Sequence, residues 1–347
     1  MRWLIDARPL ADPAQGGVSR VTRGLLEAFI SLEKKDEIAL ATTGAKKPCL
    51  NLPHDAACRH FHFHVPNKLW SIGAIAGIIA LDREAERRIG KIDAAFLPNL
   101  GFVGARQSRP YVLLLHDLSF LIEPRWFSLK TRLWHKAVNA KRLIRRAAHL
   151  LAVSEKTKRD AIRLLNIPAE RITVIPIGQT LNFSDIPPSS FHLPHSSKYI
   201  LAMGGNDPRK NIRTAIAAVE ELNRAPVFAD IHLIIIGRDI IRPSDNELAS
   251  LYRNAAAFLY PSWYEGYGLP LHEAAQFGTP CIASTAGALP ETAPAGTIFA
   301  DPAKPHHWVE ALRIVLSSPR PNPPQLDPQA WQKAAEILRD KLDCIVK

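Results

Sequence analysis

Two glutamates with seven residues between them are the first sign of chemistry in this chain. Glu265 and Glu273 bound the segment Glu-Gly-Tyr-Gly-Leu-Pro-Leu-His-Glu. Its glycines let the backbone bend sharply and come close to a ligand. Pro270 suits the first position of a helix and Gly278 suits the residue after its end, so the segment predicts a short helix over about 270–277.

The start of this predicted helix favours an anion. Its free N–H groups and the positive end of its dipole face the glycine loop, as in phosphate-binding sites. Two carboxylates are unexpected beside a site for phosphate alone, but they suit a ligand that also carries hydroxyl groups. The segment therefore predicts a diphosphate with a sugar on either side, each sugar held by one carboxylate. The alternative is a helix with two solvated carboxylates.

A basic pair, Arg209 and Lys210, follows the glycines Gly204 and Gly205 at the predicted start of another helix. A forked guanidinium and a point charge together suit a diphosphate. A basic pair on a helix otherwise faces solvent, but the glycine loop before it favours the phosphate role.

Predicted strands must position these groups. The residues from Pro110 to Leu115 are nearly all apolar, which is typical of a strand buried in a parallel sheet. This strand ends in His116-Asp117, and open α/β sheets bind ligands at the carboxyl ends of their strands. The alternative is a histidine that caps a loop. Gly16 and Gly17 lie between the first strand and a helix, where a glycine pair can cradle a phosphate.

Strand and helix patterns alternate in two series, and a stretch rich in proline and serine separates them. This order predicts an α/β protein with two doubly wound parallel-sheet domains facing across a cleft. We expect an N-terminal domain over 1–180, a linker over 181–197 and a C-terminal domain over 198–320. No Gly-x-Gly-x-x-Gly follows any predicted strand, which counts against a dinucleotide-binding fold.

The Glu-x7-Glu segment, the N-terminal glycine pair and the run Arg209-Lys210-Asn211 together resemble family 4 of the retaining glycosyltransferases, also described as glycosyl transferases group 1. That family has the GT-B fold. The resemblance implies an acceptor-binding N-terminal domain and a nucleotide-sugar-binding C-terminal domain, both Rossmann-like. It also implies that a last helix, 328–347, returns to the N-terminal domain. The resemblance is thin over 31–108 and dense over 199–302.

The resemblance assigns a role to each matching residue. Glu265 would lie against the donor sugar and Glu273 would hold the ribose, with His116 beside the reacting carbon. The implied catalytic residues are Glu265, His116, Arg209 and Lys210. The implied donor-binding residues are the glycine loops, the basic pair and the helix that follows the first glutamate: Gly16, Gly17, Gly205, Arg209, Lys210, Gly237, Gly268, Leu269 and Glu273.

One departure concerns the nucleotide base, which would lie near Gly237. The stretch between Gly237 and Ala255 is shorter than in the family, where a further strand and helix usually lie. This shortening gives some weight to a catalytically inactive homologue that binds nucleotide.

The resemblance implies that a sugar, with mannose as the candidate, moves from a nucleotide diphosphate sugar to a hydroxyl group with retention of configuration. The acceptor would be a glycan or a lipid-linked molecule in cell-surface polysaccharide or lipopolysaccharide assembly. We expect no cofactor and no metal, because the chain contains no Asp-x-Asp and cationic residues would replace the metal. The remaining alternatives are a nucleotide-sugar epimerase or a glycan phosphorylase of the same fold.

A net charge of +11 indicates an anionic partner. No nucleic-acid motif is present and aromatic residues do not interleave with the basic ones, so we expect no nucleic acid. A basic segment with apolar residues among its charges predicts a long helix over 126–147, which suits either an anionic membrane surface or solvent.

The cysteines and the apolar runs of the sequence indicate the cellular compartment. Four cysteines lie far apart in the sequence, which is typical of reduced thiols in the cytoplasm. The longest apolar run, 69–81, is shorter than the ~20 residues that span a bilayer. We therefore expect a cytoplasmic protein, peripheral to the inner face of the membrane if the basic helix binds lipid. Three alternating histidines, His60, His62 and His64, suit the polar face of a strand better than a metal site.

Overall fold

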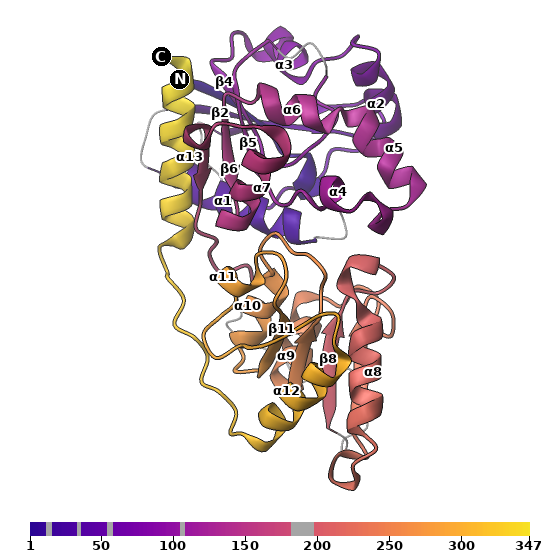
Figure 1. Ribbon diagram of the computed structural model, residues 1–347. Coiled ribbons are helices and arrows are strands. Elements are labelled where there is room, and N and C mark those ends of the chain that lie inside the picture. Colours follow the sequence, from indigo (N-terminus) through magenta and orange to yellow (C-terminus); the bar gives the residue numbers. More distant parts are fainter. Residues whose placement is uncertain (12–15, 33–35, 54–57, 105–107, 182–197) are drawn as a thin grey trace. The chain divides into compact units, whose positions relative to one another are not determined.

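The computed structural model describes residues 1–11, 16–32, 36–53, 58–104, 108–181 and 198–347. The chain forms two compact units (Figure 1). The N-terminal unit contains residues 1–178 and 327–347, and the C-terminal unit contains residues 179–326. The predicted linker, 181–197, lies outside the described residues except for Leu181.

The N-terminal unit is built on a seven-stranded parallel sheet with the order β3-β2-β1-β4-β5-β6-β7. Its strands β4 and β5 are apolar throughout because helices cover both faces of such a sheet, and every residue of both strands is buried. The strands are β1 (Arg2–Asp6), β2 (Glu37–Thr43), β3 (Cys58–Phe63), β4 (Ala94–Leu97), β5 (Tyr111–Leu115), β6 (His149–Ala152) and β7 (Ile172–Val174).

Helices of the N-terminal unit come from both ends of the chain. The last helix, α13 (Ala330–Val346), packs against α1 (Gly17–Ile30) and the central strands (Figure 1). A Cβ atom at Gly24 or Gly178 would overlap the ring of Trp331, so both glycines make room for this helix. The other helices are α2 (Asn67–Ile75), α3 (Leu81–Ile89), α4 (Ser119–Ile122), α5 (Leu129–Val138), α6 (Ala140–Arg146) and α7 (Glu155–Leu165).

The single basic helix predicted over 126–147 is wrong. Trp126 ends a 3-10 turn (Pro124–Trp126), and α5 begins only at Leu129, where the Ser128 side chain accepts a hydrogen bond from the Thr131 amide. Asn139 then takes a left-handed conformation, with φ of 53°, and separates α5 from α6. Asparagine tolerates this conformation better than most residues, so the basic segment forms two helices with a break between them.

The predicted polar histidine face of β3 also differs from expectation, because His62 is buried. The Thr42 hydroxyl lies 2.7 Å from His60 Nε2 and 3.0 Å from His62 Nδ1. Two of the imidazoles therefore hydrogen-bond to the neighbouring strand β2. No group of three or more metal-ligating side chains is arranged to hold an ion among the described residues. Within the same residues, no helix is both long enough and apolar enough to cross a bilayer.

The C-terminal unit has a five-stranded parallel sheet with the order β12-β11-β10-β8-β9. One core packs α8 and α12 on the sheet, and another packs α9 and α10 on it. The elements are β8 (Tyr199–Met203), α8 (Ile212–Leu222), β9 (His232–Ile236), α9 (Asp245–Asn254), β10 (Ala257–Tyr260), α10 (Leu269–Ala275), β11 (Cys281–Ser284), α11 (Leu289–Thr292), β12 (Ile298–Ala300) and α12 (Pro305–Ser317).

Helix α9 lies in the stretch between Gly237 and Ala255. Ser244 and Glu247 form a reciprocal capping box at its start, which fixes where the helix begins. Strand β9 therefore connects to β10 through this one helix. Strand β12, which the sequence analysis did not include, has only three residues at the edge of the sheet.

Candidate active site

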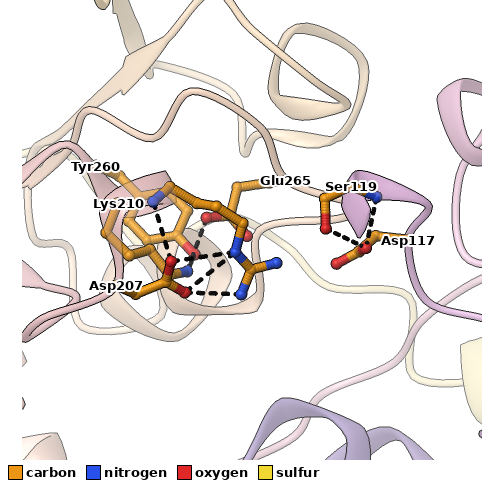
Figure 2. A network of polar contacts seen from close by, with 7 residues as sticks. Asp117, Ser119, Asp207, Lys210, Tyr260 and Glu265 are labelled. Atoms are coloured by element: carbon orange, nitrogen blue, oxygen red, sulfur yellow. Dashed lines mark hydrogen bonds and ion pairs between the residues drawn. The ribbon is translucent and has the colours of Figure 1, made fainter. Parts of the chain in front are cut away.

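A lysine and a glutamate form the centre of the candidate site in the C-terminal unit. Lys210 Nζ lies 2.7 Å from Glu265 Oε1 and donates a second hydrogen bond of 2.7 Å to the hydroxyl of Tyr260 (Figure 2). Both charged side chains are largely buried, with 17% of Lys210 and 14% of Glu265 exposed. Burial and the nearby Glu265 carboxylate raise the pKa of Tyr260 far above its usual value, so its phenol stays neutral. The ammonium group is thus held in one place.

Close backbone packing positions Lys210. A Cβ atom at Gly204 would overlap the Cβ of Lys210. Gly205 has a φ of 50°, and a Cβ atom there would lie 2.5 Å from the carbonyl oxygen of Gly237. The predicted donor-binding residues Gly205 and Gly237 therefore meet, and glycine is needed at both for the loops after β8 and β9 to touch.

The basic pair does not open a helix, contrary to the sequence-based prediction. Arg209 and Lys210 lie in a 3-10 turn (Pro208–Lys210), and α8 begins only at Ile212. Asp207 caps this turn and pairs with the Arg209 guanidinium, whose Nη2 lies 2.7 Å from Asp207 Oδ2. Burial by itself would raise the pKa of Asp207, but the hydrogen bonds and charge of Arg209 outweigh it and hold that pKa below its usual value.

Asn211 ties the turn to the loops that follow two other strands. Its side-chain amide donates to the carbonyl oxygens of Pro261, at 3.1 Å, and Pro302, at 2.9 Å. The Trp263 amide in turn donates to the Arg209 carbonyl at 2.7 Å. The basic pair and the loop with Glu265 are therefore one rigid assembly. The sequence placed Asn211 in a motif but gave no sign of this bracing role.

The backbone of Glu265 is held by the loop after β11. The Ala288 amide donates to the Glu265 carbonyl at 2.9 Å. Gly287 has a φ of 66°, and a Cβ atom there would lie 2.5 Å from the Glu265 nitrogen. Only glycine allows the two loops to come this close.

Replacing Gly287 by alanine is therefore expected to destabilise the protein. An alanine at positive φ costs about 1–2 kcal/mol by itself, and the overlap with Glu265 adds to that cost. Gly296 is a matched control, since its φ is 84° and a Cβ atom there meets no atom within 4 Å. Thermal unfolding should show a clearly larger loss of Tm for Gly287→Ala than for Gly296→Ala. Equal losses of Tm would mean that the loop with Glu265 shifts at little cost to accommodate the added Cβ atom.

The second glutamate lies on α10, which runs over Leu269–Ala275 rather than the predicted 270–277. Gly268 precedes the helix with a φ of 97°. Glu273 is only 3% exposed, and its two oxygens accept from Thr180 Oγ1 at 3.1 Å and the Tyr252 hydroxyl at 3.3 Å. Each oxygen of this carboxylate thus already accepts a hydrogen bond from a hydroxyl group of the chain. Sequence reasoning missed Thr180 and Tyr252, which lie 93 and 21 residues from Glu273 in the sequence. It also missed Tyr260, whose contact with Lys210 spans 50 residues.

His116 follows β5 in the N-terminal unit. Its Nε2 lies 2.8 Å from the carbonyl oxygen of Pro98, which can only accept, so the proton is on Nε2. Burial of the ring lowers the pKa of His116 below its usual value, which keeps the imidazole neutral near pH 7. The lone pair on Nδ1 can then accept from a hydroxyl group. The Asp117 carboxylate accepts from the amide and hydroxyl of Ser119 at 2.9 and 2.6 Å (Figure 2).

The predicted glycine pair lines a pocket of about 620 Å³ in the N-terminal unit. Gly16 has an ordinary φ of −65°, and a Cβ atom there would meet no atom within 4 Å. Glycine at this position is thus required by neither backbone strain nor packing, whereas it leaves space in the pocket. Several polar and aromatic lining residues suit sugar hydroxyls and sugar faces, and the sequence analysis did not single them out: Asp6, Arg8, Asn67, Trp70, Asn99 and Trp134.

Two units, each a parallel sheet covered by helices, define the class of Rossmann-like α/β folds. Comparisons with known proteins narrow that class. A model described as Glycosyltransferase Family 4 matches residues 15–182, and a model described as Glycosyl transferases group 1 matches residues 197–318. The chain therefore belongs to the family 4 glycosyltransferases. The resemblance drawn from the sequence is confirmed.

Curated relatives of the chain include several mannosyltransferases. It is 31% identical over 219 residues to O-antigen chain mannosyltransferase B of Escherichia coli, covering 55% of this chain and 57% of that protein. It is 27% identical over 234 residues to O-antigen chain mannosyltransferase RfbU of Salmonella typhimurium, covering 61% and 62%. The matches thus span less than two thirds of these relatives.

Solved structures show the fold. Sucrose-phosphate synthase of Thermosynechococcus elongatus aligns with a TM-score of 0.65 at 18% identity, covering 100% of this chain and 94% of that one. HepE of Anabaena, in complex with UDP-glucose, aligns with a TM-score of 0.61 at 16% identity, covering 100% and 97%. The predicted GT-B class, with two Rossmann-like domains, is confirmed.

Proposed function

We propose that the protein is a retaining, metal-independent glycosyltransferase, which moves mannose from a nucleotide diphosphate sugar to a hydroxyl group of a glycan or lipid-linked acceptor. The observation that carries the proposal is the fixed Lys210 ammonium, held between Glu265 and Tyr260 beside Arg209. The names of the O-antigen mannosyltransferases support mannose as the sugar and polysaccharide or lipopolysaccharide assembly as the setting.

The chemistry asked of these residues is mainly electrostatic. The bond between the anomeric carbon and the diphosphate breaks, and the acceptor oxygen bonds to that carbon on the same face, which retains the configuration. The proton of the acceptor hydroxyl passes to an oxygen of the departing diphosphate, which carries the negative charge of the broken bond. Lys210 and Arg209 are already positioned, so they stabilise this charge without reorganising. Two cations thereby take the place of a metal ion. Glu265 is assigned to the sugar and Glu273 to the ribose, while the roles of His116, Gly16 and Gly17 at the donor stay predictions.

Product analysis tests the proposal and separates its rivals. GDP-mannose incubated with a glycan acceptor should give a new glycoside of unchanged anomeric configuration by NMR, and a chelator should leave the rate unchanged. An epimerase would convert the donor without acceptor, and a phosphorylase would need free phosphate. Calorimetric titration of nucleoside diphosphates tests the remaining alternative, an inactive homologue, which would bind these nucleotides but would not turn over the donor. Activity that a chelator abolishes and Mg²⁺ restores would contradict metal independence.

We further propose that the protein binds to the cytoplasmic face of a membrane. Exposed apolar side chains gather on α2 and α5. Residues of both helices line the 620 Å³ pocket described above and a neighbouring pocket. The two helices lie side by side (Figure 1). Exposed cations, among them Lys68, Lys130 and Arg132, lie on the same two helices. Apolar side chains among cations suit an anionic bilayer surface. The apolar residues are Leu69, Ile72, Ile75 and Ile78 on and just after α2, and Leu129, Leu133 and Trp134 on α5.

Vesicle co-sedimentation should show binding to anionic vesicles that weakens with salt, because each basic residue near such a surface contributes ~1 kcal/mol and is screened. The double variant Ile72→Asp/Ile75→Asp should bind at least tenfold less. Val227→Asp, which alters an apolar residue that is 81% exposed on the C-terminal unit, should bind normally. Equal binding of the wild type to neutral and anionic vesicles would contradict the proposal.

A further inference from the structure

A second pocket of the N-terminal unit lies among α4, α5 and α6 and has a volume of about 460 Å³. Its lining combines half-buried apolar side chains, from Phe120, Leu121 and Phe127, with exposed cationic ones. The His135 ring stacks on Phe120 with the two centroids 4.4 Å apart. The apolar groups therefore form the deeper part of the pocket, and the charges lie at its mouth.

Three cations surround the mouth: Arg132, Lys136 and Lys141. Among the residues that the structure describes, the side chain of none of the three forms a hydrogen bond or an ion pair. No carboxylate lines the pocket, and the sequence has no acidic residue between Glu123 and Glu155. Glu123 itself pairs with Arg125 at 2.7 Å. The positive potential of the mouth is thus not neutralised from within the described chain.

We propose that this pocket binds the phosphate of a lipid-linked acceptor, with the phosphate at Arg132, Lys136 and Lys141 and the adjoining hydrocarbon on Phe120, Leu121 and Phe127. An apolar floor below a ring of cations complements a molecule that is apolar at one end and anionic at the other. This inference rests on the proposed function, since it selects a lipid phosphate over a free glycan as the acceptor.

Two observations favour an acceptor over bulk membrane lipid. The pocket is a hollow with room for one head group and a few carbons, whereas the proposed membrane surface is formed by outward-facing residues of α2 and α5. Phe120 also lies only four residues after His116, on the segment that leaves the carboxyl end of β5. The hydrocarbon of a lipid in the pocket would therefore contact the segment that also carries a predicted active-site residue.

Calorimetric titration with short amphiphiles tests the pocket. Octyl phosphate, below its critical micelle concentration, should bind with one-to-one stoichiometry and at least tenfold more tightly than inorganic phosphate or octyl glucoside. It should also bind more tightly than dihexanoyl-phosphatidylglycerol, because a pocket of about 460 Å³ has room for one short chain below the cations rather than two. The reverse preference would assign the pocket to membrane phospholipid and overturn the acceptor proposal.

Exposed cations allow a matched comparison of variants. The double variant Arg132→Ala/Lys136→Ala removes two cations of the mouth and should weaken octyl phosphate binding about tenfold or more, since hydrogen bonds to charged groups are strong. Lys130→Ala removes an equally exposed cation of α5 that does not line the pocket, so it should leave binding unchanged. If both changes weaken octyl phosphate binding equally, the binding depends on general surface charge, and the proposed pocket is wrong.

Nucleotide binding separates this inference from the function on which it rests. All these variants should bind nucleoside diphosphate as the wild type does, because the substitutions lie outside the C-terminal unit. Normal nucleotide binding without octyl phosphate binding would reject the pocket alone. A wild type that binds no nucleoside diphosphate would instead reject the proposed transferase.

Discussion

Replacing Lys210 by methionine is expected to lower kcat about 100-fold or more, as the loss of one preorganised donor does at comparable sites. The ammonium group is fixed before the donor arrives, because Glu265 and Tyr260 each hold it at 2.7 Å. Its charge becomes most useful when the diphosphate leaves. Methionine keeps much of the packing of the lysine stem while it removes the charge.

A matched control lies on the neighbouring helix. Arg213 is an exposed cation on α8, so Arg213→Met removes the same charge from the same region and should leave kcat unchanged. Steady-state kinetics with donor and acceptor, with thermal unfolding as a check on folding, provide the comparison. If Lys210→Met folds and turns over at the wild-type rate, this lysine does not stabilise the leaving group.

Changing each of the two glutamates to glutamine is expected to alter different kinetic constants. Glu265 lies at the fixed ammonium, where charge changes during transfer, so Glu265→Gln should lower kcat about 100-fold. Glu273 is assigned to the ribose, whose contacts are the same before and during the reaction. Glu273→Gln should therefore raise the donor KM about tenfold, the cost of a weakened hydrogen bond to a charged group, and leave kcat nearly unchanged.

Calorimetric titration of the nucleoside diphosphate completes this comparison. Glu265→Gln should bind the nucleotide as the wild type does, while Glu273→Gln should bind it more weakly. If the loss of nucleotide binding falls on Glu265→Gln instead, the two assignments are reversed. If neither variant changes binding or rate, the segment between the two glutamates is not the active site.

The parts of the fold that could be predicted are those in which neighbouring residues decide the outcome. Strand β5 is apolar at every position and is buried in the structure at every position, as a parallel strand between layers of helices must be. The α10 helix was also predicted to within two residues at its end, because proline and glycine mark helix limits directly. Local patterns such as these do not depend on distant parts of the chain.

The errors have a common physical origin. The charges and apolar residues of 126–147 fit one helix equally well, and nothing local shows that Asn139 takes a left-handed conformation. The same holds for the bonds that organise the candidate site. Lys210 meets Tyr260 only because β8 and β10 are neighbours in the sheet, and Asn211 reaches Pro302 only through the end of β12. Such contacts depend on strand order, which a single sequence does not give.

The return of α13 to the N-terminal unit has a consequence for the order of events during synthesis. Residues 1–178 leave the ribosome first, yet the groove beside Gly24 and Gly178 stays empty until Trp331 has been made. Arg339, whose side chain is buried against Asp36, arrives later still. All residues of the C-terminal unit have been synthesised by then, so this unit can complete its folding before the N-terminal unit does. Limited proteolysis of ribosome-bound chains should accordingly find residues 179–326 protected before residues 1–178, and the unit that is begun first is finished last.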